Sequence, residues 1–214
     1  ASTEILKNTS LKSILSASYR QAYAYRVDFY TQYSVGGKGP NKLRESVKKV
    51  ALGLFSDEIA GSLSSLAKQD IQANITKMVL AEQWGLLSAQ TYTIHPPTLR
   101  ALRESWNRLE ATFPPGCKET RARDILLELL NPPYGHDYNT LTLLLAAWIG
   151  YRRHEIRISL GGQLMSLEKF KNYFGDTKNP KDFLDRLLVK YPLAISRINA
   201  DEMFAEVDSI LEQI

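Results

Sequence analysis

The sequence predicts a mainly α-helical, bundle-like domain with one or two short β-hairpins. Apolar residues recur at helical spacing along most of the 214 residues. They make up 44% of the chain against 23% charged residues, a balance typical of globular domains. Gly161-Gly162 stands between two alternating segments, and such a pair favours a hairpin turn. These three observations indicate a helical core with a small strand element.

Four helices are expected in the first 85 residues. The first begins after Ser10, a candidate N-cap, and runs to about Thr31. The glycine-rich "SVGGKGPNK" breaks the pattern, and a second helix follows over residues 41–55. Residues 56–69 and 70–85 predict two more helices, with candidate caps at Asp57, Asp70 and Gly85.

The middle of the chain predicts a short strand followed by two helices. "LLSAQTYTIH" alternates weakly over residues 86–94 and indicates the strand. Pro97 suits the first turn of a helix that runs to about Thr112. After a loop at 113–118, the helix "TRARDILLELLN" is ended by Pro132-Pro133.

The last third predicts the most apolar helix, "YNTLTLLLAAWIGY", then the hairpin "HEIRISLGGQLMS" and three further helices. The N-caps expected for those three helices are Ser166, Asn179 and Asn199. Two domains would divide at the 113–118 loop, into a helical part at 1–112 with a basic first segment and a second helical part at 113–214. The alternative is one continuous domain.

Residues 120–176 have the element order of a winged-helix domain: helix, turn, helix and hairpin. Trp106, Ile125, Leu144 and Ile156 are expected to share its core. In a DNA-binding version, the helix before the hairpin enters the major groove and presents polar residues. Here that helix is apolar around nearly its whole circumference, so we expect it to be buried and not to contact bases.

The stretch "NPPYGHDYNTLTLLLAAWIGYRR" is interpreted as a structural motif, and Pro133, Tyr134, Gly135 and Trp148 are its key residues. Gly135 gives the turn conformational freedom. His136-Asp137 is interpreted as turn and cap material.

No motif predicts catalysis, a cofactor or a metal site. The single Cys117 excludes an intramolecular disulfide, and the three histidines lie in separate elements without ligand spacing. A G-x-S-x-G nucleophile motif is absent, and "GGKGPNK" lacks the Walker A spacing. We therefore predict no catalytic, cofactor-binding or metal-binding residues.

Residues 1–50 hold nine Lys or Arg residues against three acidic ones, whereas the whole chain has a net charge of +4. A basic segment can bind DNA or RNA, although a solvated helix face is the favoured interpretation. Tyrosines interleaved with Arg20 and Arg26 suit base stacking, but packing is favoured for them too. The candidate nucleic-acid-binding residues are Arg20, Arg26, Lys42, Arg44, Lys48 and Lys49.

The start of the chain, "ASTEILKNTS", lacks the apolar region of a signal peptide, and the apolar run near 141–150 is too short to cross a bilayer. We therefore predict a cytoplasmic protein without membrane contact. The absence of an initial Met leads us to expect a fragment of a larger protein, whose other domains would be its partners.

Two segments, "EQWGLLSAQTYTIHPPTLRALRESWNRLE" and "LLNPPYGHDYNTLTLLLAAWIG", resemble the large P-loop ATPases of bacterial BREX phage-defence systems (BrxC/PglY-like). The resemblance covers about residues 83–170 and is most specific at Pro133-Tyr134-Gly135. It implies a non-catalytic helical region downstream of the nucleotide-binding core, and no ATPase residue carries over. The first functional hypothesis is thus a scaffold module of such an ATPase, the second is nucleic-acid binding, and a stand-alone enzyme is the third.

Overall fold

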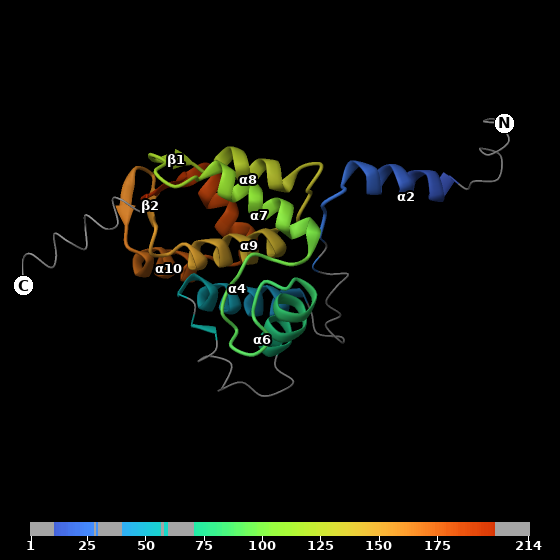
Figure 1. The fold of residues 1–214 in the computed structure, drawn as a ribbon, viewed down its shortest axis with the longest axis horizontal. Helices are drawn as coiled ribbons and strands as arrows, with labels where there is room; N and C mark the ends of the chain where they lie inside the picture. Colours follow the sequence, from blue (N-terminus) through green and yellow to red (C-terminus); the bar gives the residue numbers. More distant parts are fainter. Residues whose placement is uncertain (1–10, 28, 30–39, 57, 60–70, 200–214) are drawn as a thin grey trace, which may run out of the picture.

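Helix α9 (Tyr138–Tyr151) lies at the centre of the fold, between helices α7 and α8 on one side and α4 on the other (Figure 1). The computed structural model describes residues 11–27, 29, 40–56, 58–59 and 71–199 of the chain. One cluster of buried apolar side chains runs through these layers, and it includes residues from both 1–112 and 113–214. The fold is mainly helical with a small antiparallel sheet, as the sequence predicts.

The other described helices surround this centre or continue from it. Two of them, η1 and η2, are π-helical continuations of the short helices that precede them. Their bounds are α2 (Leu11–Ala22), α4 (Pro40–Ser56), α6 (Ile71–Asn74), η1 (Ile75–Gln83), α7 (Arg100–Thr112), α8 (Arg123–Leu130), α10 (Leu167–Gly175), α11 (Pro180–Asp185) and η2 (Arg186–Lys190).

A four-stranded antiparallel sheet closes one end of the helical body, in the order β1-β4-β2-β3. Its strands are β1 (Thr120–Arg121), β2 (Ile156–Leu160), β3 (Gln163–Met165) and β4 (Leu193–Arg197). The β2–β3 hairpin turns at Gly161 and Gly162, which both have positive φ, so the predicted hairpin is confirmed. Strand β4 pairs with both β1 and β2 and separates them, an arrangement that the winged-helix order at 120–176 does not contain.

Helix α9 is buried from Asn139 to Gly150, as its apolar sequence predicts. Its N-terminus is capped by Asp137, whose carboxylate accepts hydrogen bonds from the amides of Asn139 and Thr140. Near its other end, Gly150 allows the backbone of α4 to approach closely. A Cβ atom at Gly150 would lie 1.9 Å from the carbonyl oxygen of Leu54, so a glycine is required where the two helices cross.

Helix α2 extends away from this body, at the opposite side from the sheet (Figure 1). Its side chains are exposed from Lys12 to Ala22. The predicted helix to Thr31 is wrong beyond this point: α2 ends at Ala22, and Arg26 and Val27 are non-helical. The reason is a set of long-range hydrogen bonds that holds this part of the chain on the loop before α9.

Two further predictions need correction. Residues 86–94 form only an isolated bridge between Leu87 and Ile94, because no described neighbouring strand extends it. Strand β4 was not predicted at all. Most of the predicted helix at 56–69 and the caps at Ser10, Asp57 and Asp70 lie outside the described residues, as does the last helix after Asn199.

Candidate functional site

The clearest candidate for a functional element is α2 together with the segment that attaches it to the body. We call residues 23–27 and 29 the tether, and residues 131–137, between α8 and α9, the anchor loop. The tether lies along the anchor loop although more than a hundred residues separate the two in sequence. The attachment therefore fixes where α2 leaves the body.

Backbone amides of the tether donate to the anchor loop at alternate positions. The amide of Tyr25 donates to the carbonyl of Pro133 at 3.0 Å. The amide of Val27 donates to Nδ1 of His136 at 3.3 Å, and that of Phe29 donates to the Asp137 carboxylate at 3.0 Å. Residues 23–25 form a turn, and Arg26 and Val27 have no regular structure, so α2 does not continue into the tether. The three amides are engaged by the anchor loop instead of by carbonyls of a continuing helix.

Aromatic packing adds to these hydrogen bonds. Tyr25 stacks on the buried Tyr134, with ring centroids 5.5 Å apart. The ring of Tyr23 lies over Gly135, where a Cβ atom would come within 2.3 Å of it. Gly135 also has a φ of +58°, so it serves both the turn and the close approach of the tether.

His136 and Ser105 form a buried pair that resembles catalytic machinery but has the wrong hydrogen-bond pattern for it. Nε2 of His136 lies 2.7 Å from the Ser105 hydroxyl. Because Nδ1 accepts from the Val27 amide, the proton of a neutral imidazole must be on Nε2, which therefore donates to Ser105. The Ser105 hydroxyl in turn donates to the carbonyl of Ala101. A histidine in this tautomer does not accept the serine proton, so the pair is structural.

The environment of His136 keeps the imidazole neutral. Burial lowers its pKa from 6.5 to about 4, and the nearby positive charge of Arg26 acts in the same direction. The side chain is 3% exposed, so no substrate reaches it. The neutral form is the one that can accept the Val27 amide, and the low pKa therefore supports attachment of the tether at neutral pH.

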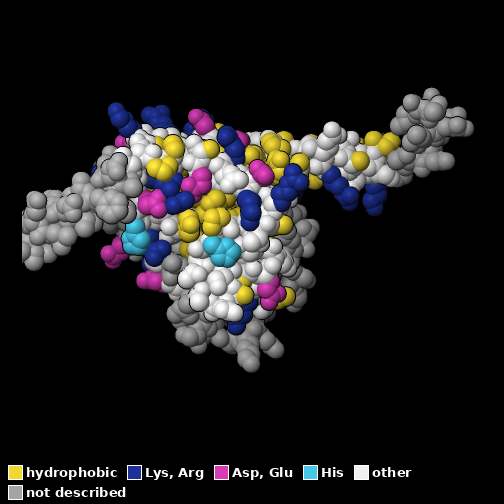
Figure 2. Space-filling model, in the orientation of Figure 1, with side chains coloured by type: hydrophobic (Ala, Val, Ile, Leu, Met, Phe, Trp, Pro, Cys, Tyr) yellow, Lys and Arg dark blue, Asp and Glu magenta, His cyan; other side chains and the backbone are white. Residues whose placement is uncertain are grey.

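Helix α2 presents an apolar side and a basic side (Figure 2). Ile14, Leu15 and Tyr19 are 38%, 60% and 45% exposed. Leu15 and Tyr19 lie one helical turn apart, and Ile14 lies next to Leu15. The helix contains Lys12 and Arg20 but no acidic residue. Three of the seven exposed large apolar residues in the described part of the chain lie on α2, and the others are Met78, Leu164, Val189 and Tyr191. The apolar side of α2 is therefore an unusual feature of the described surface.

Five of the six basic residues predicted to bind nucleic acid have described side chains, and these lie on α2, in the tether and on α4. Arg20 is exposed on α2, and the guanidinium of Arg26 lies 5.4 Å above the Tyr19 ring. Arg44 is exposed on α4, whereas Lys49 forms an ion pair with Glu45 at 3.2 Å. The Lys42 side chain lies outside the described residues.

Lys48 has a structural role that its sequence position did not reveal. Its ammonium group donates to the carbonyl oxygens of Gly175 and Thr177, at the end of α10. A cation in this position satisfies carbonyls that the helix leaves unpaired and is favoured by the helix dipole. Lys48 thus joins α4 to α10.

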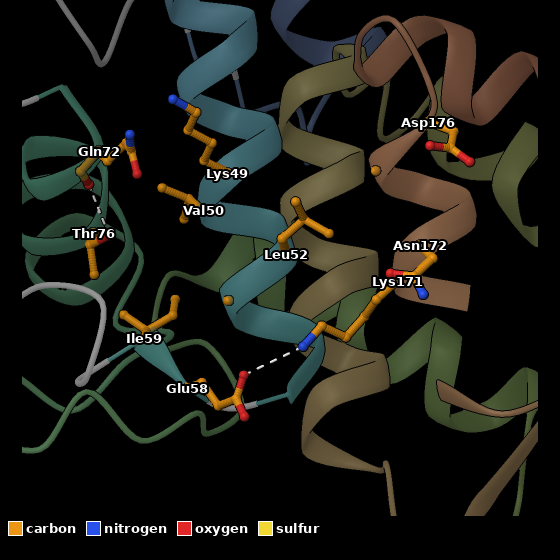
Figure 3. Close-up of a pocket in the computed structure, with 12 residues that line it drawn as sticks. Lys49, Val50, Leu52, Glu58, Ile59, Gln72, Thr76, Lys171, Asn172 and Asp176 are labelled. Carbon is orange, nitrogen blue, oxygen red and sulfur yellow. Dashed lines mark hydrogen bonds and ion pairs between the residues drawn. The ribbon is translucent and has the colours of Figure 1, made fainter. Parts of the chain in front are cut away.

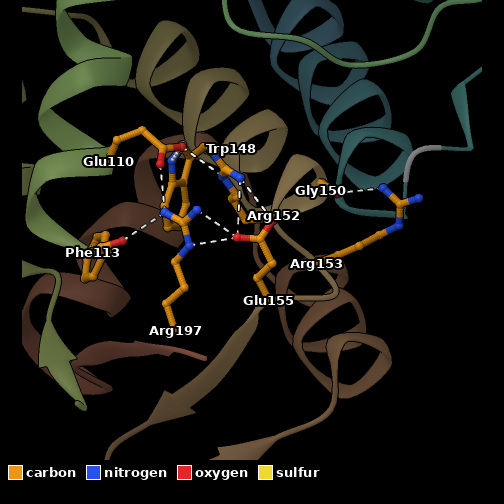
Figure 4. A network of polar contacts seen from close by, with 8 residues as sticks. All are labelled: Glu110, Phe113, Trp148, Gly150, Arg152, Arg153, Glu155 and Arg197. Atoms are coloured by element: carbon orange, nitrogen blue, oxygen red, sulfur yellow. Dashed lines mark hydrogen bonds and ion pairs between the residues drawn. The ribbon is translucent and has the colours of Figure 1, made fainter. Parts of the chain in front are cut away.

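A network of two arginines and two glutamates connects α7, the end of α9 and β4 (Figure 4). Arg197, 5% exposed, pairs with Glu110 and Glu155, both at 2.7 Å. Arg152 contacts the same two carboxylates at 3.0 Å. Trp148, predicted to be a key structural residue, donates its indole N–H to Glu110. Because these charges balance and their donors are already engaged, we interpret the network as structural.

A cavity of about 500 Å³ opens between α4 and α10 (Figure 3). Its lining includes Lys49, Glu58, Lys171 and Asp176, so opposite charges balance within it. Lys171 and Glu58 form an ion pair at 3.4 Å. A hydrogen bond from the Ser56 hydroxyl and the charge of Lys171 lower the pKa of Glu58. Lys49 pairs with Glu45 outside the lining, and the balanced charges that remain indicate no particular ligand.

Within residues 11–27, 29, 40–56, 58–59 and 71–199, no group of three or more His, Cys, Asp or Glu side chains could hold a metal ion. Among the same residues, no helix combines the length and apolar character needed to span a bilayer. No family model, curated protein or solved structure matches the chain.

Packing is the favoured interpretation for the tyrosines near Arg20 and Arg26, but Tyr19 is exposed on α2. Tyr23 and Tyr25 do pack, as favoured, because the tether holds them on the anchor loop. The signal that could have separated the two groups is the change from helical spacing in α2 to alternate contacts in the tether. That change depends on a partner segment that is distant in sequence.

Proposed function

We propose that this chain is a non-catalytic interaction module and that α2 is its binding element. The observation that carries the proposal is the exposed apolar side of α2 on a helix that extends from the body at a fixed attachment point. Exposed apolar surface on a soluble domain costs free energy unless a partner covers it. A helix held in its binding conformation also loses less conformational entropy when it binds.

A photo-crosslinking experiment in the source organism tests this function. The complete gene would carry a benzophenone amino acid either at Leu15, on the apolar side of α2, or at Ala17, an exposed residue on the opposite side. We expect a discrete covalent adduct of higher mass from position 15 and none from position 17. Equal yields from the two positions, or no adduct from either, would contradict the proposal.

The resemblance to BREX-type ATPases supports a more specific form of this proposal. In that form, the module belongs to a cytoplasmic, defence-related P-loop ATPase, and α2 contacts another part of the same large protein. The sequence of the genomic open reading frame tests it directly. A Walker A motif upstream of residue 1 agrees with the proposal, whereas a start codon adjacent to Ala1 contradicts it.

Nucleic-acid binding is the second candidate function, and the exposed Arg20 and Arg44 favour it. It has less support than protein binding, because Lys48 is bound to backbone carbonyls and Lys49 to Glu45. Contacts with phosphates would make the affinity fall steeply as salt concentration rises. A mobility-shift titration with duplex DNA and with RNA at several salt concentrations tests this, and the absence of any shift near physiological ionic strength refutes it.

A further inference from the structure

The apolar side of α2 contains a pair of exposed residues with the spacing of a helix that binds in a groove. Leu15 and Tyr19 are four residues apart, and Ile14 lies next to Leu15. Helices that bind in grooves use anchor residues at i, i+3, i+4 and i+7 positions, and Leu15 with Tyr19 forms an i, i+4 pair. Leu15 is the most exposed of the three and is the natural central anchor.

The direction of α2 is fixed by contacts at its C-terminal end. The ring of Tyr19, in the last turn of α2, lies 4.7 Å from that of Tyr23, which packs over Gly135 of the anchor loop. The Arg26 guanidinium covers the Tyr19 ring. In addition, the amide of Tyr23 donates to the carbonyl of Tyr19. The anchor loop is thus connected to the binding side of the helix by a continuous set of contacts.

The charges next to the apolar side are positive. Lys12 and Arg20 are exposed and lie about two helical turns apart, and α2 contains no acidic residue. A complementary surface would therefore place carboxylates beside an apolar groove, because opposite charges at the rim of an interface favour encounter and orientation.

A second copy of α2 does not provide enough surface for a stable pair. A helix of 12 residues is about 18 Å long. Two such helices side by side would bury less than the roughly 1,000 Å² expected of a specific interface. A groove encloses more of the circumference of a helix and buries more area for the same length.

A lipid surface is also a poor match for α2. Helices that lie in a membrane interface bury a large apolar side of Trp, Phe and Leu and have a polar side rich in Lys and Arg. The 12 residues of α2 contain Leu but neither Trp nor Phe, and only Lys12 and Arg20 are basic.

We propose that α2 binds, as a preformed helix, in an apolar groove of a partner protein whose rim carries carboxylates. This inference rests on the proposed function and specifies the chemistry of the partner. In the complex, Leu15 is the central anchor, Ile14 and Tyr19 flank it, and Lys12 and Arg20 contact the acidic rim.

The test uses calcium-loaded calmodulin as a groove of this chemistry, since it binds basic amphipathic helices in an apolar, acidic-rimmed groove. The full 214-residue chain is titrated with fluorescently labelled calmodulin. The matched variants are Leu15→Glu and Ala17→Glu, because they place the same charge on exposed positions on opposite sides of α2. We expect Leu15→Glu to weaken binding at least about tenfold and Ala17→Glu to weaken it less than about threefold.

Two further titrations examine the other occupants. Vesicles that contain anionic phosphatidylserine represent a membrane, and duplex DNA represents a nucleic acid. Binding to calmodulin that weakens with salt and is lost in Leu15→Glu supports the inference. The inference is overturned if calmodulin does not bind at about 100 μM, if the two variants behave alike, or if vesicles or DNA bind more tightly.

These outcomes are separate from those of the crosslinking experiment. An adduct from position 15 in cells, without binding to calmodulin, would support α2 as a binding element but contradict its binding in an apolar groove with an acidic rim. The absence of an adduct from either position would instead overturn the module itself.

Discussion

The attachment of α2 depends on a histidine that stays neutral, and this makes the stability of the fold dependent on pH. The pKa of His136 is about 4 in the folded chain, mainly because the side chain is buried, against 6.5 for an ordinary imidazole. One pKa unit corresponds to about 1.4 kcal/mol, so the difference corresponds to at most about 3 kcal/mol of unfolding free energy. The perturbation we consider is acidification from pH 7.5 to pH 4.

The direction of the effect follows from which state binds the proton first. Between pH 6.5 and about 4, the unfolded chain protonates His136 while the folded chain does not. The unfolded state then carries more bound protons, so the unfolding free energy rises with pH across this interval. The contribution of His136 is complete above pH 6.5 and is lost as the pH falls toward 4.

Urea unfolding of the wild type and a His136→Gln variant at several pH values measures this contribution. Glutamine does not titrate, so carboxylates that also lose stability in acid affect both proteins equally. We expect the wild type to lose about 3 kcal/mol more than the variant between pH 6.5 and 4, even though the variant is less stable at pH 7. His154→Gln, at an exposed position, is the control and should follow the wild type. Parallel curves for the wild type and His136→Gln would refute the reasoning.

Three further substitutions test the packing and the charges around this framework. Gly150→Ala should destabilise the fold by about 3 kcal/mol in urea unfolding, because its Cβ would meet a carbonyl of α4. Gly175→Ala is the control and should cost nothing, since its Cβ would have no atom within 4 Å. Equal stability of the two variants would contradict the close crossing of α4 and α9. Gly135→Val should lower the melting temperature and speed hydrogen exchange in the tether, because the new side chain would overlap the Tyr23 ring and because φ is positive at this position. A variant that melts like the wild type would show that the anchor loop is misinterpreted. Arg197→Met should lower the unfolding free energy by about 3–5 kcal/mol, because two partly buried carboxylates lose a partner. Arg108→Met removes an exposed ion pair and should lower it by less than about 1 kcal/mol. Similar losses would mean that the network is solvated.

The parts of the fold that the sequence predicted correctly are those determined by local pattern. Helix α9 was recognisable because its apolar residues leave no polar side, and the hairpin because Gly161-Gly162 interrupts an alternating pattern. The caps Ser166 and Asn179 accept the expected amide hydrogen bonds, since capping involves residues only three positions apart.

The remainder could not be predicted, because it depends on contacts between distant segments. Strand β4 is a strand because β1 and β2 provide partners on both of its edges. The end of α2 at Ala22 is set by hydrogen bonds to the anchor loop, more than a hundred residues away. The sequence therefore indicates apolar and aromatic residues at helical spacing near the start of the chain, and only the structure separates those that are exposed from those that pack.

The position of α9 explains why binding should occur at the periphery of this fold. A helix buried on all sides cannot present side chains to a groove of DNA, whatever the order of the elements around it. An isolated helix of 12 residues such as α2 is marginally stable in water, because nucleation is unfavourable and a short helix forms few hydrogen bonds to offset it. Contacts of Tyr19 with Tyr23 and Arg26 brace its last turn, and a partner that covers Leu15 would stabilise the rest. Binding should therefore appear as increased amide protection that begins at the attached end of α2 and extends toward Leu11, while the anchor loop remains unchanged.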